Sequence, residues 1–509
     1  MNLDHDACYR AIVTRDARFD GRLYIGVRTT GIYCRPICPA RTPKRENVSF
    51  YPTAAAAQEA GFRPCLRCRP ENSPDLAAWN GTSNTVKRAL ALIGEGALDD
   101  ETVDHLAEQL GVGERHLRRL FQQHLGASPI AVAQTRRILF AKQLIMETRM
   151  PMTEIAHAAG FGSIRRFNAV FQALYKRPPG ALRRTRQNAH RDVSVSDIVL
   201  TMSYAAPYAW PSMISFLQAR AIPGVEWVDQ QDRYHRSIAL DGCQGSVRVA
   251  FDENKKCLRA TIRFPRISSL AVIVSRLRRM FDLTADPTAI DTHLANDPRL
   301  APLIAARPGL RVPGAWDGFE LGIRAILGQQ ISVAAATTLA GKLVSLYGEP
   351  LESSLRSEGL KYIFPSPKRL AGTDLRSLGM PGTRARALSA LSEAALETPN
   401  MFSASQAPDA TLERLKTLPG VGDWTSQYIL MRALCEPDAF PAADIGLMRA
   451  MASKEGQRPT PATLLQHAEA WRPWRAYATL HLWASEGNTS ATDICTTKEK
   501  ITHAATLIP

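Results

Sequence analysis

Two pairs of closely spaced cysteines near the start of the chain restrict its N-terminal fold more than any other feature. Cys34 and Cys38 are separated by three residues, and Cys65 and Cys68 follow after a gap of 26 residues. Each pair presents its sulfurs from a tight turn, so the two pairs can converge on one tetrahedral zinc ion. The first residues are acidic and lack an apolar stretch, which predicts an intracellular chain whose clustered cysteines bind metal rather than form disulfides. Spacing alone favours a structural zinc knuckle.

The residues around these cysteines favour a reactive zinc centre instead. Residues 27–38 (VRTTGIYCRPIC), 45–50 (RENVSF) and 60–68 (AGFRPCLRC) resemble the zinc domain of the Ada family of adaptive-response proteins. The resemblance implies that the Cys34 thiolate irreversibly accepts a methyl group from a DNA methylphosphotriester, while the other three cysteines complete the metal site. Zinc keeps the sulfur deprotonated, and a methylated phosphotriester is uncharged, so the DNA backbone repels the nucleophile less. The alternative is a purely structural zinc domain.

The next hundred residues contain an internal repeat. Residues 106–112 (LAEQLGV) recur 49 positions later as residues 155–161 (IAHAAGF). Each copy precedes a basic amphipathic segment, 114–125 or 163–175, and a helix over about 130–146 joins the two units. The pattern resembles the AraC-type DNA-binding domain, whose second helix in each unit enters the major groove; the alternative is a scaffold with solubilising arginines. The residues expected to reach base edges are Arg115, Arg118, Arg119, Arg165 and Arg166.

After residue 197 the pattern changes to a mixed and then an almost entirely helical one. Apolar residues alternate with polar ones over 247–251 and 258–264, which predicts a small antiparallel sheet. Helices are expected over 211–221 and 267–281 beside this sheet. From about residue 285, prolines and glycines separate successive helical segments, so an all-α domain is predicted to follow the sheet domain.

Two features of the helical part indicate chemistry. Residues 418–422 (LPGVG) form a helix–hairpin–helix signature, in which Gly420 and Gly422 allow backbone N–H groups to approach a DNA phosphate. Asp444 lies 22 residues after Gly422 at the start of a predicted helix, where by itself it would be a helix cap. Together with residues 319–329 (FELGIRAILGQ), the hairpin and Asp444 resemble DNA glycosylases of the AlkA type.

This resemblance implies a monofunctional DNA glycosylase that hydrolyses the N-glycosidic bond of alkylated bases such as 3-methyladenine. Asp444 is implied as the catalytic carboxylate, which stabilises an oxocarbenium-like state and orients water. In relatives that also cut the strand, a Schiff-base lysine stands where this chain has Trp424. The wedge that fills the gap left by the flipped base is an apolar leucine in close relatives and corresponds to Gln330 here. A monovalent cation on the hairpin carbonyls is a further implication.

The pocket for the flipped base is implied to be aromatic. An electron-rich pocket attracts a positively charged alkylated purine more strongly than a neutral base. Each aromatic residue taken alone is typical of a helical core, and only the hairpin and Asp444 favour the pocket interpretation. The implied pocket residues are Phe216, Trp424, Tyr428 and Trp483.

The whole chain of 509 residues has 63 Lys and Arg against 48 Asp and Glu, a formal net charge of +15. This excess favours a polyanionic partner, here double-stranded DNA at alkylated sites and promoters. The sequence contains no run of 18 apolar residues, so no membrane span is predicted. The expected fold is multidomain and mainly α with α+β parts. It comprises a zinc domain over 1–78, an AraC-type double helix-turn-helix over 82–186, a small TBP-like sheet domain over 197–283 and an all-α helix–hairpin–helix glycosylase core over 284–492.

We therefore expect a bifunctional alkylation-damage response protein, in which a transcriptional activator that senses methylphosphotriesters is joined to a base-excision glycosylase. We expect a bacterial, cytoplasmic and nucleoid-associated monomer that contacts RNA polymerase. The alternative is a regulator whose glycosylase fold only binds DNA or recognises damage, and Gln330 at the wedge position keeps this alternative open.

Overall fold

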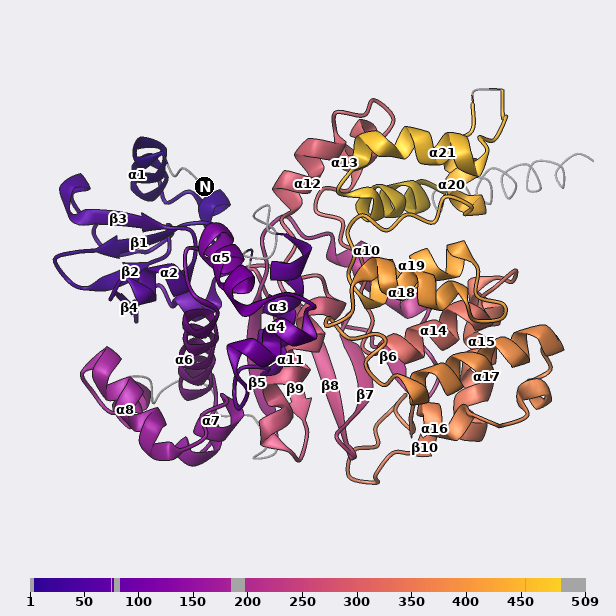
Figure 1. Cartoon of the computed structure of the whole chain (residues 1–509), viewed down its shortest axis with the longest axis horizontal. Helices are drawn as coiled ribbons and strands as arrows, with labels where there is room; N and C mark the ends of the chain where they lie inside the picture. The colour runs from indigo at the N-terminus through magenta and orange to yellow at the C-terminus, as the bar shows by residue number, and fades with distance from the viewer. Residues whose placement is uncertain (1–3, 75, 77–82, 185–196, 454, 487–509) are drawn as a thin grey trace, which may run out of the picture.

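The computed structural model describes residues 4–74, 76, 83–184, 197–453 and 455–486, so the predicted domain ends at 77–78, 185–186 and 487–492 lie outside it. The N-terminal part is a four-stranded sheet in the order β3-β1-β2-β4 (Figure 1). β1 pairs antiparallel with β2 and β3, whereas β2 and β4 run parallel. Its elements are α1 (His5–Val13), β1 (Tyr24–Val27), β2 (Ile32–Cys34), β3 (Val48–Tyr51), α2 (Ala54–Glu59) and β4 (Arg63–Pro64).

Helices α3 to α9 follow and contain the predicted repeat. The predicted helix over 114–125 is confirmed as α5, which ends where Gly126 adopts a φ of +67°. The segment 163–175 forms α8, and the hydroxyl of Ser163 accepts the backbone N–H of Arg166 at its start. The predicted connecting helix is confirmed as α6. The bounds are α3 (Asn84–Glu95), α4 (Val103–Gln109), α5 (Glu114–Leu125), α6 (Pro129–Glu147), α7 (Met152–Ala158), α8 (Ile164–Tyr175) and α9 (Pro179–Arg184).

A five-stranded antiparallel sheet occupies the centre of the molecule, in the order β5-β9-β8-β7-β6 (Figure 1). The predicted strands over 247–251 and 258–264 lie in β8 and β9, and the predicted flanking helices correspond to α10 and α11. The other three strands were not predicted. The bounds are β5 (Ile198–Ser203), α10 (Trp210–Ala219), β6 (Glu226–Val228), β7 (Tyr234–Leu240), β8 (Cys243–Asp252), β9 (Cys257–Arg263) and α11 (Leu270–Met280).

The remainder is helical around one apolar core, as predicted, apart from a two-residue strand pair, β10 (Glu349–Pro350) and β11 (Tyr362–Ile363). None of the helices in the described part of the chain combines the length and apolar character needed to span a membrane. The bounds are α12 (Pro287–Leu294), α13 (Ala301–Ala306), α14 (Gly318–Leu327), α15 (Val333–Tyr347), α16 (Pro367–Leu370), α17 (Gly382–Glu397), α18 (Pro408–Lys416), α19 (Asp423–Ala433), α20 (Ile445–Ala450), α21 (Pro461–Ala468) and a helical segment over 475–486.

Helix α6 joins the N-terminal parts to the central sheet. Its Lys142 is fully buried and donates to the Cys65 carbonyl at 2.9 Å and to Glu71 at 2.6 Å. Glu71 also pairs with Arg69, whose other nitrogen lies 2.9 Å from Glu147 at the end of α6. A continuous chain of polar contacts therefore runs from the cysteine cluster to the last turn of α6.

The same helix covers the edge strand of the central sheet. β5 pairs on one side with β9, and its outer side faces α6. The Thr201 backbone N–H donates to Glu147 at 2.9 Å, and its carbonyl accepts from Gln143 at 2.7 Å. Apolar residues of α6 to α9 and of the sheet form one shared core cluster. An edge strand otherwise presents unpaired backbone groups, so α6 completes the sheet that follows it in the chain.

Candidate metal centre and active site

The structure brings the four predicted cysteine ligands together. Their sulfur atoms all lie within 4.8 Å of one another, which fits a tetrahedral site, because zinc–sulfur bonds of about 2.3 Å place the ligands roughly 3.8 Å apart. Two backbone N–H groups point at sulfur: that of Arg35 lies 3.4 Å from Cys68 Sγ, and that of Arg67 lies 3.3 Å from Cys65 Sγ. Such bonds favour thiolates, so the donor set suits a divalent metal ion.

The four ligands differ in their exposure to solvent. Cys65 and Cys68 are buried, whereas Cys34 and Cys38 are partly exposed. Cys34 ends β2, and the following residue, Arg35, donates to Asp20 at 2.8 Å and to the Cys68 carbonyl at 3.2 Å. A reactant from solvent therefore reaches the first cysteine pair, and burial alone does not distinguish Cys34 from Cys38.

The five predicted base-reading arginines lie on exposed faces of α5 and α8. The two helices bury matching apolar faces, Leu117, Phe121 and Leu125 in α5 and Phe167, Phe171 and Tyr175 in α8. Arg118 pairs with Glu114 on the same helix at 2.9 Å. The exposed arginines are Arg115, Arg118, Arg119, Arg165 and Arg166. This duplicated placement is that of a nucleic-acid interface.

The predicted hairpin lies between α18 and α19. Gly420 has a φ of +77°, and an added Cβ there would lie 2.9 Å from the Ala387 side chain, so glycine is required. Gly422 caps the N-terminus of α19. The Gln329 amide donates to the Gly420 carbonyl at 2.9 Å and fixes the neighbouring turn, whose tip is the exposed Gln330 at a φ of +58°. Gln330, the predicted wedge residue, thus lies next to a residue that is bonded to the hairpin.

Asp444 stands at the start of α20, where its carboxylate accepts three N–H groups. Oδ1 accepts from the Leu447 backbone at 2.9 Å and from Trp483 Nε1 at 2.9 Å, and Oδ2 accepts from Trp424 Nε1 at 2.7 Å. Donors to both oxygens fix the orientation of the carboxylate. The carboxylate is half-buried and therefore both held in place and accessible.

Three of the predicted pocket aromatics gather beside this carboxylate. Trp424 stacks on Tyr428 with ring centroids 5.3 Å apart, and Tyr428 lies 6.3 Å from Trp483. Phe216 comes from α10 of the sheet domain, and the guanidinium of Arg432 bridges it to Tyr428, at 4.8 Å and 5.4 Å from the two ring centroids. The sheet domain and the helical core therefore both contribute side chains to one aromatic cluster beside Asp444, where the base pocket was predicted.

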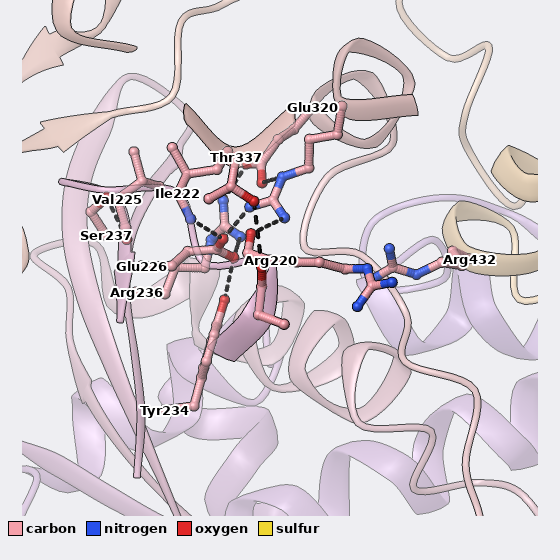
Figure 2. A network of polar contacts seen from close by, with 12 residues as sticks. Arg220, Ile222, Val225, Glu226, Tyr234, Arg236, Ser237, Glu320, Thr337 and Arg432 are labelled. Carbon is pink, nitrogen blue, oxygen red and sulfur yellow. Dashed lines mark hydrogen bonds and ion pairs between the residues drawn. The ribbon is translucent and has the colours of Figure 1, made fainter. Parts of the chain in front are cut away.

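Sequence reasoning missed the two arginines of this pocket, Arg220 and Arg432 (Figure 2). Arg432 Nη1 donates to the Tyr428 hydroxyl at 2.6 Å, and the spacing of four residues within α19 was the available signal. Burial raises the pKa of Tyr428, but the two adjacent guanidinium groups outweigh it and lower that pKa below its ordinary value. The Tyr428 oxygen is therefore a strong hydrogen-bond acceptor for these cations.

A buried cluster of opposite charges lies behind Arg220 (Figure 2). Arg236 donates to Glu226 at 2.8 Å, and Arg324 lies 3.1 Å from Glu320. Arg324 also donates to the Arg220 carbonyl at 3.2 Å, so the cluster fixes the end of α10 against α14. The cluster therefore holds the end of α10 in place beside the predicted base pocket.

Comparison with known proteins matches four families along the chain. These are "Metal binding domain of Ada" over residues 7–71, "Helix-turn-helix domain" over 106–185, "AlkA N-terminal domain" over 199–317 and "HhH-GPD superfamily base excision DNA repair protein" over 323–476. The first match and the four converging sulfurs identify the metal as zinc. The domain types predicted from the sequence are confirmed.

Three relatives represent different extents of the chain. A "Probable bifunctional transcriptional activator/DNA repair enzyme AlkA" of Mycobacterium tuberculosis is 41% identical over 488 residues, 95% of this chain and 97% of the relative. "DNA-3-methyladenine glycosylase 2" of Escherichia coli is 38% identical over 56% of this chain and 97% of its own length. "Bifunctional transcriptional activator/DNA repair enzyme Ada" of Escherichia coli is 36% identical over 31% of this chain and 43% of its own length.

Proposed function

Because the chain belongs to the family of bifunctional transcriptional activator/DNA repair enzymes AlkA, we propose that it is a DNA-alkylation sensor and a DNA glycosylase in one polypeptide. The glycosylase hydrolyses the N-glycosidic bond of alkylated bases such as 3-methyladenine. The N-terminal part accepts a methyl group from a DNA methylphosphotriester and activates transcription. The observation that carries the enzymatic half is the Asp444 carboxylate held by two indole N–H groups beside a cluster of aromatic side chains.

The glycosylase reaction needs little acid catalysis, because an alkylated purine already carries positive charge. As the bond between the sugar and the base lengthens, positive charge develops on the sugar, and the Asp444 carboxylate stabilises it. The bonding electrons leave with the base. Asp444 orients a water molecule and takes its proton as the new bond to the sugar forms. Trp424 stands where a lysine nucleophile would be needed to cut the strand, so base release is the whole reaction.

The methyl transfer uses the partly exposed Cys34. Its sulfur attacks the methyl carbon, a sulfur–carbon bond forms, the carbon–oxygen bond breaks, and the electron pair stays on the phosphate oxygen. When bound, zinc would keep the four thiols deprotonated at neutral pH. Cys38, Cys65 and Cys68 would hold the metal ion together with Cys34, and four thiolates on one divalent ion would give the cluster a net negative charge before transfer. The product loses one negative charge, so its affinity for DNA rises.

Both proposed activities act on DNA, and the helices of the chain provide the contacts to it. The five exposed arginines of α5 and α8 read promoter bases, and Gly420, Gly422 and Gln330 contact the strand that carries the lesion. Further parts of the proposal are a monovalent cation on the hairpin carbonyls, contact with RNA polymerase, and action as a cytoplasmic, nucleoid-associated monomer. The duplicated helix-turn-helix supports the monomer, because one chain carries both reading helices.

Base release from methylated duplex DNA tests the enzymatic half. We expect the wild-type protein to free 3-methyladenine, identified by chromatography, and Asp444→Asn to free none while it still binds DNA. If both proteins release base, Asp444 is not the catalytic group. If neither does, the glycosylase fold serves only binding or damage recognition.

Transfer of labelled methyl groups from methylphosphotriester DNA tests the sensor half. We expect the wild-type protein to become labelled once per chain and Cys34→Ala to remain unlabelled. Cys38→Ala is the matched control, because it removes the other partly exposed ligand of the same cluster. Labelling of Cys34→Ala would overturn the assignment of the acceptor.

A further inference from the structure

Two guanidinium groups lie over the Phe216 ring. Arg220 Cζ lies 3.8 Å from the ring centroid and Arg432 Cζ lies 4.8 Å from it. The two cations lie side by side (Figure 2), and within the described residues neither forms an ion pair with a carboxylate. The ring that would stack on the base is therefore already in contact with positive charge.

The two arginines are held differently. Arg432 is buried and donates to the Pro313 carbonyl at 2.7 Å, the Tyr428 hydroxyl at 2.6 Å and the Gly314 carbonyl at 3.3 Å. The Arg220 side chain is partly exposed and makes a 3.5 Å contact with the Phe216 carbonyl besides its interaction with Tyr428. Arg432 is thus held by two backbone carbonyls and the Tyr428 hydroxyl, whereas the Arg220 guanidinium contacts only Phe216 and Tyr428 among the described residues.

The backbone of Arg220 does not share this freedom. Its N–H donates to the Leu217 carbonyl at 3.1 Å, and its carbonyl accepts from Arg324 at 3.2 Å, within the buried charge cluster behind the pocket. The Arg220 side chain is therefore able to rotate about a stationary backbone. Burial lowers the pKa of Arg220, and the Arg432 charge adds to this effect, so its charged form gains solvation by leaving the pocket.

A cationic base and the Arg220 guanidinium compete for the same position. Both are attracted by the negative face of an aromatic ring, and Arg220 is the nearer of the two cations that already lie over Phe216. Two positive charges in a pocket of low dielectric constant also repel each other. An alkylated purine stacks on Phe216 only after Arg220 has left.

We propose that Arg220 is a gate that determines specificity: its guanidinium occupies the place of the base on Phe216 and swings to solvent when a cationic base enters. This inference rests on the proposed glycosylase activity. The gate acts on base entry after the protein has bound DNA. It therefore affects the rate of base release at saturating protein and leaves binding to undamaged duplex unchanged.

Single-turnover release from a duplex that carries one 7-methylguanine, a cationic base, tests the gate. We expect Arg220→Ala to release this base roughly three- to tenfold faster than wild type, the change expected from removing one competing cation–ring contact. Arg220→Lys keeps the charge but loses the planar group that stacks on the ring, so its rate should lie between those of wild type and Arg220→Ala. Arg276→Ala is the matched control, because Arg276 lies 5.3 Å from the Trp316 ring, away from the base pocket.

The outcomes separate the gate from the activity on which it rests. Release by wild type but not by Asp444→Asn establishes the glycosylase. With that result in hand, an Arg220→Ala rate equal to or below wild type overturns the gate, and so does an equal acceleration by Arg220→Lys. Binding of undamaged duplex by Arg220→Ala, measured by fluorescence anisotropy, checks fold and DNA affinity, and weakened binding would also contradict a role confined to base entry.

Discussion

Trp424 and Asp444 stand twenty residues apart in the chain, yet the indole Nε1 lies 2.7 Å from the carboxylate Oδ2. The same indole stacks on Tyr428 with an angle of 8° between the ring planes. One side chain therefore both orients the proposed catalytic carboxylate and forms a wall of the base pocket. Trp483 repeats the arrangement from the other side, at 2.9 Å from Oδ1.

The hydrogen bonds of the two indoles are separable from their aromatic surfaces. Trp424→Phe and Trp483→Phe keep a ring but lose the donor, and a bond to a charged acceptor contributes about 1.5–3 kcal/mol. We expect each variant to slow single-turnover base release by roughly ten- to a hundredfold. Trp227→Phe is the control, because its buried indole N–H has no hydrogen-bond partner among the residues that the structure describes. Unchanged rates in both pocket variants would assign the tryptophans to stacking alone.

The buried Lys142–Glu71 pair should dominate the stability of the junction between the N-terminal parts. Lys142→Met leaves the Glu71 carboxylate beside Arg69 but without its nearest cation, a change that costs about 3–5 kcal/mol for buried pairs. Urea unfolding followed by fluorescence measures it. Lys44→Met removes the exposed ion pair between Lys44 and Glu46, whose charged atoms lie 3.8 Å apart, and should change the free energy of unfolding little. Equal stabilities of the two variants would contradict the role of the buried pair.

His481 predicts a loss of stability in mild acid. Burial, with a smaller contribution from Arg307, lowers the pKa of His481 to about 4, below its value of about 6.5 in the unfolded chain. Below pH 6.5 the unfolded state binds a proton that the folded state does not, so stability falls until the pH reaches about 4. We expect His481→Phe to lose less stability over this interval, by up to about 3 kcal/mol, in urea unfolding at several pH values. Parallel pH curves for both proteins would refute the assignment.

The two helix-turn-helix units should contribute to DNA binding in the same way. Arg115→Ala and Arg165→Ala each remove an exposed guanidinium from one reading helix. We expect each to lower affinity for a binding site selected from random duplexes by about 1–3 kcal/mol and to relax base preference over one half of that site only. Arg248→Ala, on an exposed part of the central sheet, is the control for general loss of positive charge. A uniform loss on all sequences would indicate phosphate contacts instead.

Short-range rules accounted for most of what the sequence predicted. Helix α5 begins at Glu114 and ends before Gly126 as expected, because its apolar spacing and its terminal glycine are local signals. The metal centre was predictable for the same reason, since two close cysteine pairs separated by a loop favour one tetrahedral metal site. The hairpin and Asp444 were predictable through the resemblance that their spacing carries.

Buried charges were not predictable, because a charged side chain is expected to be exposed until its partner is known. Lys142 and Glu71 are 71 residues apart, and Arg236 and Glu320 are 84 apart, so no local pattern joins them. The orientation of the Trp424 indole could not be predicted from the sequence for a similar reason. It depends on how two distant segments pack, and the same residue type also suits a stacking wall. Strand β5 was not predicted, because its outer edge is completed by a helix from another part of the chain.

Helix α6 covers the outer edge of β5 and so couples the two halves of the chain structurally. Gln143 and Glu147 belong to a helix of the DNA-reading half, yet they satisfy the backbone of a strand in the repair half. A substitution at either position disturbs the repair enzyme without touching a promoter. Separating the two halves would therefore expose the backbone edge of β5, and the repair half would need another cover for that strand.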